Sequence, residues 1–495
     1  MFLTIDQGTT SSRALLFNEK GQIIDLFQKE FKQFYPKEGW VEHNPNEILS
    51  SIIYCCEAIL EKNSNTDIKS IGITNQRETI LAWNKKTGKP FYNAIVWQDR
   101  RTSEFCFNLK SDGLEKDINK KTGLLLDPYF SASKISWLLN NVDGLRQLAN
   151  KGEVCFGTID CWLVWNLTKG KVFATDVTNA SRTSLLNIHS IKWDDDLLKI
   201  FDIPIGCLPE VKNSNDYFGE SSLLSKKLKI TGVIGDQQSS AFGQLCHQKG
   251  DIKSTYGTGC FVLANTGNKI IYSKKKLLTT IAYKINNDIS YAVEGSIFMA
   301  GGLMNWLKSN LGFFDKISDS SEFASHADPE SKIVIVPAHS GLGAPHWSSE
   351  ARGSIFGMNQ DTGVSELTHA SLQSISLQTH DLMSAVRDDF LNNGLDLSTS
   401  LKIDGGMIEN DWFIQNLSDI TNSNIQKSFT KEATALGAAM ISGLGIGFYS
   451  NFDDFKGFNL TKEQIIPNMH LDLREKIIRN WTKAIKLTIE MAKKD

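Results

Sequence analysis

The sequence predicts an α/β fold built as two related lobes. Strand-like and helix-like segments alternate along the 495 residues, which is typical of sheets flanked by helices. A strand, a turn rich in Gly and Thr, and a second strand occur near residue 8 and again near residue 258. Because the two occurrences lie about half a chain apart, we expect two lobes, residues 1–243 and 244–495.

The first lobe is expected to open with a meander of three short strands. These strands are residues 2–5, 14–17 and 22–26. A helix follows, because Asn44 can cap it, Pro45 suits its first position, and Glu47 stands where a capping box needs a carboxylate. Further strands are expected at 70–74, 79–83 and 230–234, before the boundary near Gly243.

The second lobe repeats this opening. Strands are expected at 251–256 and 261–264, separated by Gly257-Thr258-Gly259. A long helical pattern at 365–386 and an Ala/Gly-rich segment at 434–445 are assigned to this lobe.

Composition narrows the function classes. The chain carries 53 basic and 56 acidic side chains, a net charge of −3, so a nucleic-acid partner is not expected. No stretch approaches the roughly 20 apolar residues that span a bilayer, so no membrane insertion is expected. The eight cysteines show no metal-binding spacing and indicate reduced thiols in a cytoplasmic protein.

The turn from Asp6 to Arg13 is the first candidate for chemistry. Successive backbone N–H groups in such a turn can form a nest for a phosphate, and Thr9, Thr10 and Ser11 add hydroxyl donors. Arg13 adds a charge-assisted donor, and Asp6 could hold a hydrated Mg²⁺. The alternative is a plain hairpin turn.

Three further loops carry similar signals. Asp236 follows a strand directly, although it could simply cap a helix. Thr258 lies in the second Gly/Thr turn, and Gly405-Gly406 would let a flat ligand approach the backbone. Their joint occurrence predicts two phosphate-binding turns, one in each lobe, that face each other across a cleft. No Gly-x-x-x-x-Gly-Lys-Ser/Thr motif is present, so a P-loop is excluded.

The sequence resembles the FGGY family of carbohydrate kinases along nearly its whole length. The segments that carry the resemblance are 5–13, 39–43, 73–79, 93–98, 127–131, 178–183, 235–238, 256–261, 341–345 and 404–406. The resemblance implies two ribonuclease H-like lobes of the actin-like ATPase type. Each would have a mixed sheet flanked by helices, with an interlobe cleft.

Segments 73–79 and 127–131 resemble most the family members that phosphorylate glycerol. The resemblance implies transfer of the ATP γ-phosphate to glycerol with Mg²⁺, and a homo-oligomer. It implies Asp236 as general base and Asp6 in the Mg²⁺ shell. The implied glycerol-binding residues are Arg77, Glu78, Trp97, Tyr129, Asp236, Gln237 and Phe261. The implied nucleotide-binding residues are Thr9, Thr10, Ser11, Arg13, Thr258, Gly301, Asn305, Gly406 and Asn410.

Some positions depart from the family pattern, and alternatives stay open. Asn305 stands where Gln is usual, and His346 where an aromatic is expected. Residues 220–229 lack both the Gly-rich Arg loop for fructose 1,6-bisphosphate and a histidine for phosphorylation. Arg77 and Glu78 could be a surface ion pair, and Trp97 and Phe261 core aromatics. The rival functions are a kinase of another polyol or ketose, and a non-catalytic nucleotide sensor.

Overall fold

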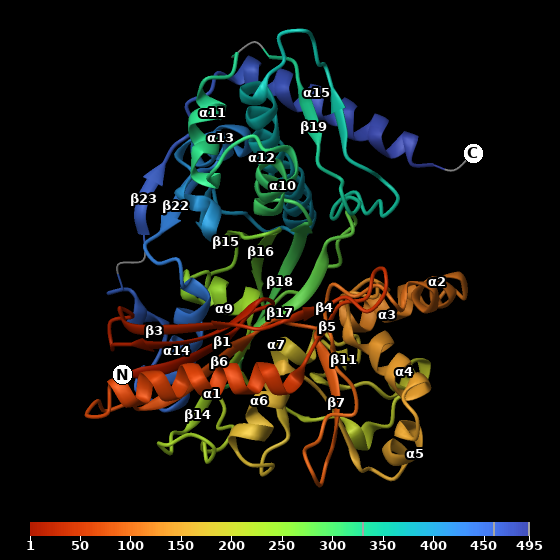
Figure 1. Cartoon of the computed structure of the whole chain (residues 1–495), viewed down its shortest axis with the longest axis vertical. Coiled ribbons are helices and arrows are strands. Elements are labelled where there is room, and N and C mark those ends of the chain that lie inside the picture. Colours follow the sequence, from red (N-terminus) through yellow and green to blue (C-terminus); the bar gives the residue numbers. More distant parts are fainter. Residues whose placement is uncertain (329–330, 459–460, 494–495) are drawn as a thin grey trace. The chain divides into compact units, whose positions relative to one another are not determined.

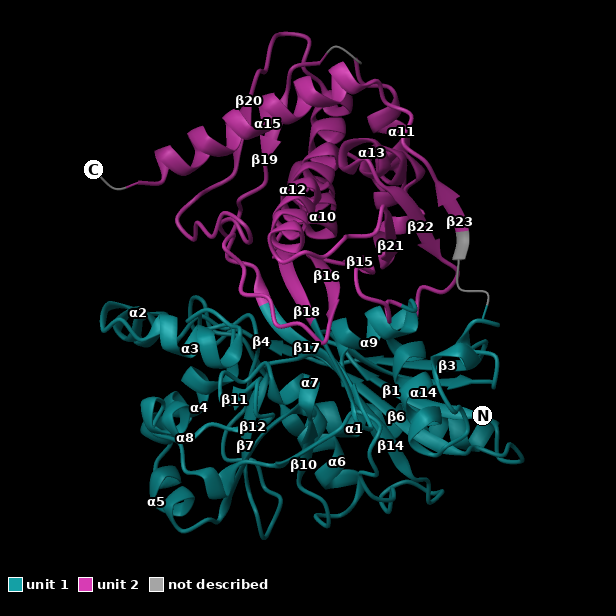
Figure 2. Cartoon of the chain, turned by 180° about the vertical axis from the view of Figure 1, so that it is seen from behind, with its two compact units in different colours: residues 1–245, 279–291, 433–458 teal, residues 246–278, 292–432, 459–495 magenta. Residues whose placement is uncertain are grey.

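The computed structural model describes residues 1–328, 331–458 and 461–493, which form two compact units (Figure 2). Unit 1 comprises Met1–Leu245, Thr279–Tyr291 and Ala433–Phe458, and unit 2 holds the other described residues. The units are therefore discontinuous, whereas the segments 1–243 and 244–495 expected from the sequence are continuous. Contacts between residues far apart in sequence decide this division.

The central sheet of unit 1 has the strand order β14-β6-β1-β2-β3 (Figure 1). Its strands are β1 (Phe2–Gln7), β2 (Ser11–Phe17), β3 (Ile23–Glu30), β6 (Ser70–Asn75) and β14 (Ile230–Gly235). The first three form the expected antiparallel meander, and β6 and β14 run parallel to β1. Thr74 of β6 lies opposite both Asp6 and Ile234. The carboxyl ends of three parallel strands consequently meet at one edge.

Helix α1 (Pro45–Lys62) begins where the sequence predicts. The Asn44 side chain accepts a hydrogen bond from the Asn46 backbone N–H, which caps the helix. Glu47 accepts instead from the Lys32 backbone N–H, at 3.3 Å. The predicted apolar face, including Ile48 and Ile52, is buried against β1, β2 and β3.

Helix α14 (Ala433–Gly445) belongs to unit 1, whereas the sequence assigned residues 434–445 to the second lobe. It packs against α9 (Asp236–Gly243) and across β14, β6 and β1. Glycine makes the helix contact possible: a Cβ at Gly437 would lie 1.9 Å from the Ser239 carbonyl oxygen. The Ala/Gly composition reflects this close helix crossing.

A second sheet of unit 1 has the order β4-β5-β8-β7-β9. Its strands are β4 (Gln33–Phe34), β5 (Glu42–His43), β7 (Ile80–Asn84), β8 (Ala94–Ile95) and β9 (Val154–Thr158). The remaining helices are α2 (Ser103–Ser111), α3 (Glu115–Thr122), α4 (Ser131–Asn141), α5 (Leu145–Asn150), α6 (Ile159–Leu167), α7 (Val177–Ala180) and α8 (Asp195–Ile200). Short strands β10 (Ala174–Asp176), β11 (Leu186–Asn187), β12 (Lys192–Trp193) and β13 (Glu210–Lys212) complete this part.

The sheet of unit 2 repeats the topology of unit 1. Its order is β17-β18-β16-β15-β21-β22-β23, although most of β17 and the start of β18 are assigned to unit 1. The strands are β15 (Ile252–Tyr256), β16 (Cys260–Gly267), β17 (Leu278–Ile285), β18 (Asp288–Ile297), β21 (Ser400–Asp404), β22 (Asn424–Ser428) and β23 (Thr461–Ile465). Strand β15 pairs antiparallel with β16 and parallel with β21, as β1 does with β2 and β6. The predicted internal repeat is confirmed.

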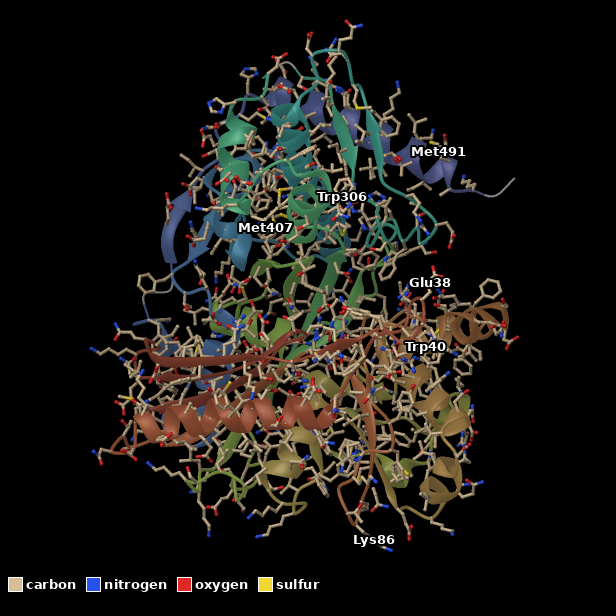
Figure 3. All side chains as sticks on the ribbon, viewed as in Figure 1. Glu38, Trp40, Lys86, Trp306, Met407 and Met491 are labelled. Carbon is tan, nitrogen blue, oxygen red and sulfur yellow. The ribbon has the colours of Figure 1, made fainter. Side chains whose placement is uncertain are left out.

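Helices pack around the sheet of unit 2. They are α10 (Gly301–Leu311), α11 (Ser320–Ser325), α12 (Val364–Asn392), α13 (Asp411–Thr421) and α15 (Leu471–Met491), with the antiparallel pair β19 (Val334–Val336) and β20 (Ser354–Phe356). Trp306 and Met407, labelled in Figure 3, pack against the apolar core of this unit. Across the described ranges, no helix is both long and apolar enough to cross a bilayer.

Candidate active site

The candidate acceptor site lies where the parallel strands of unit 1 end. Asp6 is the penultimate residue of β1, Asn75 ends β6, and Asp236 follows β14 directly. In open α/β sheets, ligands bind at the carboxyl ends of the strands. Strand register alone therefore brings the two predicted acidic residues to the same edge.

Arg77 and Asp236 form an ion pair at this edge. Arg77 Nε lies 3.2 Å from Asp236 Oδ1, and Arg77 Nη1 donates to Gln238 Oε1 at 3.2 Å. The helix-cap alternative does not hold for Asp236, because the cap position of α9 is Gly235 and Asp236 is its first helical residue. The carboxylate is held beside a buried guanidinium but remains partly exposed.

Glu78 is buried and pairs with Arg182. Arg182 Nε lies 2.6 Å from Glu78 Oε1, and the Glu78 carbonyl accepts from the Ser131 hydroxyl at 2.9 Å. Glu78 has φ +61°, a left-handed conformation that costs energy for a residue with a Cβ. Because both Arg77 and Glu78 are buried, the surface ion-pair alternative is wrong.

Sequence reasoning missed Arg182 as a member of this site. Residues 178–183 are among the segments that resemble the family, but the sequence alone assigns no role to them. In the structure, Thr178 Oγ1 accepts from the Gly235 backbone N–H, and Asn179 exchanges amide hydrogen bonds with Asn75. This segment therefore supports the ends of β6 and β14 together.

Trp97 and Tyr129 form an aromatic wall beside the first Gly/Thr turn. Their ring centroids lie 5.6 Å apart in an edge-to-face arrangement. Trp97 Nε1 donates to Thr9 Oγ1 at 3.0 Å, which links the wall to the turn. Both side chains are only partly buried, so neither is a plain core aromatic. Phe261, the other predicted wall residue, lies on β16, which is assigned to unit 2.

The first Gly/Thr turn, between β1 and β2, is closed by a backbone hydrogen bond. The Gly8 N–H donates to the Ser11 carbonyl at 2.9 Å, and Gln28 Nε2 donates to Ser11 Oγ at 3.0 Å. Thr10 is exposed, and Arg13 lies opposite Asp6 in the β1–β2 pairing. The turn thus places hydroxyl groups and one guanidinium next to the strand end that carries Asp6.

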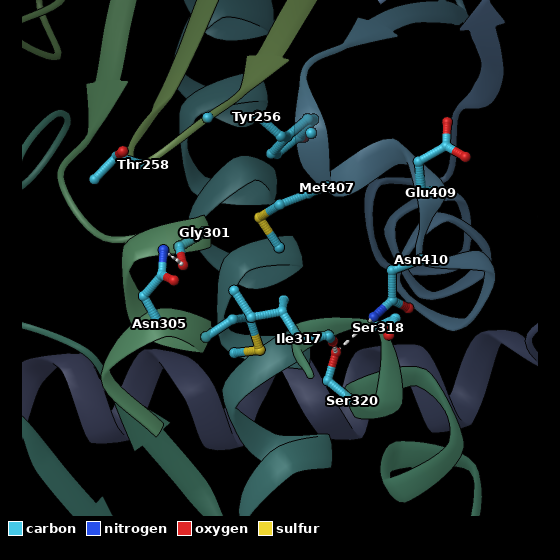
Figure 4. A pocket seen from close by; sticks show the side chains of 13 residues that line it. Tyr256, Thr258, Gly301, Asn305, Ile317, Ser318, Ser320, Met407, Glu409 and Asn410 are labelled. Carbon is cyan, nitrogen blue, oxygen red and sulfur yellow. Dashed lines mark hydrogen bonds between the residues drawn. The ribbon is translucent and has the colours of Figure 1, made fainter. Parts of the chain in front are cut away.

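A pocket of about 410 Å³ in unit 2 collects five of the predicted nucleotide-binding residues (Figure 4). They are Thr258, Gly301, Asn305, Gly406 and Asn410. The size lies within the range of small-molecule sites. Thr9, Thr10, Ser11 and Arg13 belong to unit 1.

The pocket is built where α10 starts against the second Gly/Thr turn. The Gly301 and Gly302 N–H groups donate to the Gly257 and Thr258 carbonyls, both at 2.9 Å. A Cβ at Gly301 would lie 2.6 Å from the Gly257 oxygen, so glycine is needed for this approach. At Gly406 a Cβ would meet nothing within 4 Å, which leaves that part of the pocket open.

Several lining residues had no sequence signal. Met304, Ile317 and Met407 supply apolar surface, and Ser318, Ser320 and Glu409 supply polar atoms. Asn410 Nδ2 donates to Ser320 Oγ at 3.0 Å, while its Oδ1 accepts from the Phe413 N–H and caps α13. Only folding brings residues 317–320 beside 406–410, so no local motif could indicate them.

The residues present fit a hydrated Mg²⁺ better than a metal held fully by protein. Among the described residues, no group of three or more His, Cys, Asp or Glu side chains could hold a metal ion. Asp6 supplies a carboxylate at the strand end, and Mg²⁺ prefers few carboxylates together with water and phosphate oxygens. His346 pairs elsewhere, with Asp381 Oδ2 at 2.9 Å.

The repeated sheets and the pocket beside a Gly/Thr turn place the chain among the sugar kinases of the actin-like ATPase fold. The models of the FGGY family of carbohydrate kinases match it, the N-terminal domain over residues 1–243 and the C-terminal domain over 252–445. The chain belongs to this family.

Named relatives match this chain along nearly its whole length. A protein named glycerol kinase from Sinorhizobium fredii is 49% identical over 494 residues, covering 99% of both chains. Glycerol kinase 1 from Clostridium tetani is 46% identical, covering 100% of this chain and 99% of its own. A crystal structure of Plasmodium falciparum glycerol kinase with ADP matches with a TM-score of 0.91 at 39% identity, covering 98% of each chain.

Proposed function

We propose that this protein transfers the γ-phosphoryl group of ATP to glycerol, giving sn-glycerol 3-phosphate and ADP. The observation that carries the proposal is the burial of Arg77 and Glu78 just after β6, with the Glu78 partner Arg182 lying 5.5 Å from the ring centroid of Tyr129. Glycerol offers three hydroxyls and a short carbon chain. A small site with a guanidinium, a carboxylate and aromatic surface matches that chemistry.

The relatives support the substrate. Proteins named glycerol kinase are 46% to 49% identical to this chain over nearly its whole length. A xylulose kinase from Lactobacillus acidophilus shares only the fold, with 20% identity and a TM-score of 0.86. The likeness of sequence therefore favours glycerol over a five-carbon sugar.

The proposed acceptor chemistry uses the residues at the strand ends. Arg77 and Glu78 hold two hydroxyls, and Tyr129 and Gln237 complete the polar contacts. Trp97 covers the carbon chain, a role that the resemblance also implies for Phe261. Asp236 accepts the proton of the third hydroxyl as its oxygen attacks the γ-phosphorus. Phosphoryl transfer depends chiefly on positioning, so a carboxylate of ordinary basicity suffices.

The proposed nucleotide site is the pocket of unit 2, and the resemblance implies phosphate contacts from the Gly/Thr turn of each unit. Gly406 and Asn410 contact the adenosine. The phosphates are held by Thr9, Thr10, Ser11, Arg13, Thr258, Gly301 and Asn305. The hydrogen bonds from the first turn of α10 to the Gly257 and Thr258 carbonyls fix the position of Thr258 in the pocket. Mg²⁺, held by Asp6 partly through water, would neutralise phosphate charge.

An ADP-release assay tests the proposal. We expect turnover that requires both Mg²⁺ and glycerol, and slower turnover with dihydroxyacetone, erythritol and xylulose. A comparable kcat/KM for xylulose would reject glycerol as the substrate. ADP release that is absent with every acceptor would favour the nucleotide-sensor alternative.

We also propose a cytoplasmic, homo-oligomeric enzyme. All eight cysteines are free and buried, which supports a reducing compartment. The oligomer rests on the family resemblance alone. Light scattering of the purified protein would decide it, since a single 55.2 kDa species contradicts it.

A further inference from the structure

Lys134 is a buried lysine to which no motif and no proposed catalytic step assigns a role. It lies in the first turns of α4 and is among the largest fully buried side chains of the protein. Its ammonium donates a hydrogen bond to the main-chain carbonyl of Tyr129 at 2.8 Å.

The burial of this ammonium is unfavourable by itself. Desolvation lowers the pKa of Lys134 to about 8, although the carboxylates of Glu78, Asp99 and Asp127 act in the opposite direction. Arg100 adds a further lowering. An apolar side chain of similar volume would avoid the cost of burying a charge. Packing alone therefore does not explain a lysine here.

The hydrogen bond from Lys134 to the Tyr129 carbonyl gives a better reason for a lysine at this position. Tyr129 forms the aromatic wall with Trp97, and its backbone and ring are both held by neighbouring groups. The Tyr129 N–H donates to Asp127 Oδ1 at 2.9 Å, its carbonyl accepts from Lys134, and the Arg182 guanidinium lies 5.5 Å from its ring centroid. Of these, the Lys134 contact restrains the carbonyl side of the peptide.

We propose that Lys134 is a positioning residue for the acceptor site: its ammonium holds the Tyr129 backbone and so fixes the wall against which glycerol lies. The inference rests on the proposed function. Lys134 itself need not touch the substrate. Loss of the contact should weaken glycerol binding and leave nucleotide binding and the chemical step nearly intact.

Lys134→Met tests this directly. A hydrogen bond to a charged group is lost, so we expect the KM for glycerol to rise about tenfold or more, with kcat and the KM for ATP within about twofold. Lys427→Met is the matched control, because Lys427 is also a buried lysine but lies on β22 of unit 2. A KM for glycerol that stays within about twofold in Lys134→Met overturns the proposal.

A double-mutant cycle separates positioning from a general structural role. If Lys134 acts through Tyr129, Lys134→Met should raise the KM little further in a Tyr129→Ala background. Additive effects on KM contradict the proposal. If Lys134→Met does not fold, Lys134→Leu replaces it, and its effect on the KM for glycerol is compared in the same two backgrounds.

Wild-type turnover in the same assay reports on the proposed function independently. If the wild type does not phosphorylate glycerol, the proposed function fails, and the near-ultraviolet circular dichroism of the aromatic wall decides the positioning role. Lys134→Met is then expected to change that spectrum more than Lys427→Met does. Equal spectra would overturn the positioning role as well.

Discussion

Arg77 Nε lies 3.2 Å from Asp236 Oδ1, and the two residues follow adjacent parallel strands of one sheet. The Arg77 side chain is 2% exposed and that of Asp236 is 30% exposed. A buried guanidinium thus holds a carboxylate that still has a free approach from solvent. That arrangement orients Asp236 without enclosing it, as a proposed general base requires.

Asp236→Asn should remove the base while keeping a side chain of the same shape beside Arg77. We expect kcat to fall by about 10² to 10⁴, the range typical of general acid–base catalysis. Glycerol affinity, measured by calorimetry, should change little. Near-normal turnover in this variant would contradict the assignment of Asp236.

Arg182→Ala should remove the guanidinium that pairs with the buried carboxylate of Glu78. We expect a loss of about 3–5 kcal/mol in the free energy of unfolding, measured by urea denaturation, because removing one member of a buried ion pair leaves the other charge buried with less compensation. Arg146→Ala is the control, since Arg146 pairs with the exposed Asp202 and should cost about 0–1 kcal/mol. Equal losses in both variants would argue against a buried pair.

Asn410→Ala should affect both stability and nucleotide binding. Asn410 caps α13 and lines the pocket, so we expect a loss of about 1 kcal/mol in unfolding free energy and a higher KM for ATP. Asn44→Ala removes a comparable cap from α1 in unit 1 and should lower stability similarly. An equal rise of the KM for ATP in both variants would exclude a specific role for Asn410.

Asp160 should make stability fall with rising pH. Burial, reinforced by the charge of Asp176, raises the pKa of Asp160 to about 7, above its value in the unfolded chain. The folded state therefore binds more protons between about pH 4 and 7, and its stability decreases through that window by up to about 1.4 kcal/mol per pH unit.

Asp160→Asn should remove that contribution. In urea titrations, the unfolding free energy of Asp160→Asn minus that of the wild type is expected to increase from about pH 5 to about pH 7, because the wild type loses stability over that range. Asp361→Asn makes the same chemical change at an exposed position and controls for a general effect of replacing Asp by Asn. A difference that is constant with pH would contradict the raised pKa.

Local patterns in the sequence determined much of the fold. The meander at residues 2–26, the cap at Asn44 and the two Gly/Thr turns are all present, because hydrophobic alternation and capping act over a few residues. The nucleotide-binding residues taken from the resemblance, such as Gly301 and Asn410, do meet in one pocket. Their roles there remain predictions.

Only the tertiary structure decided which distant groups meet. The pairing of Glu78 with Arg182, the contact of Lys134 with Tyr129, and the packing of α14 within unit 1 leave no local signal. A buried charge needs a partner, and a glycine-lined helix needs a close neighbour, but neither requirement names the partner. The sequence by itself determined the strand ends and turns that carry the chemistry, while packing decided which side chains hold them in place.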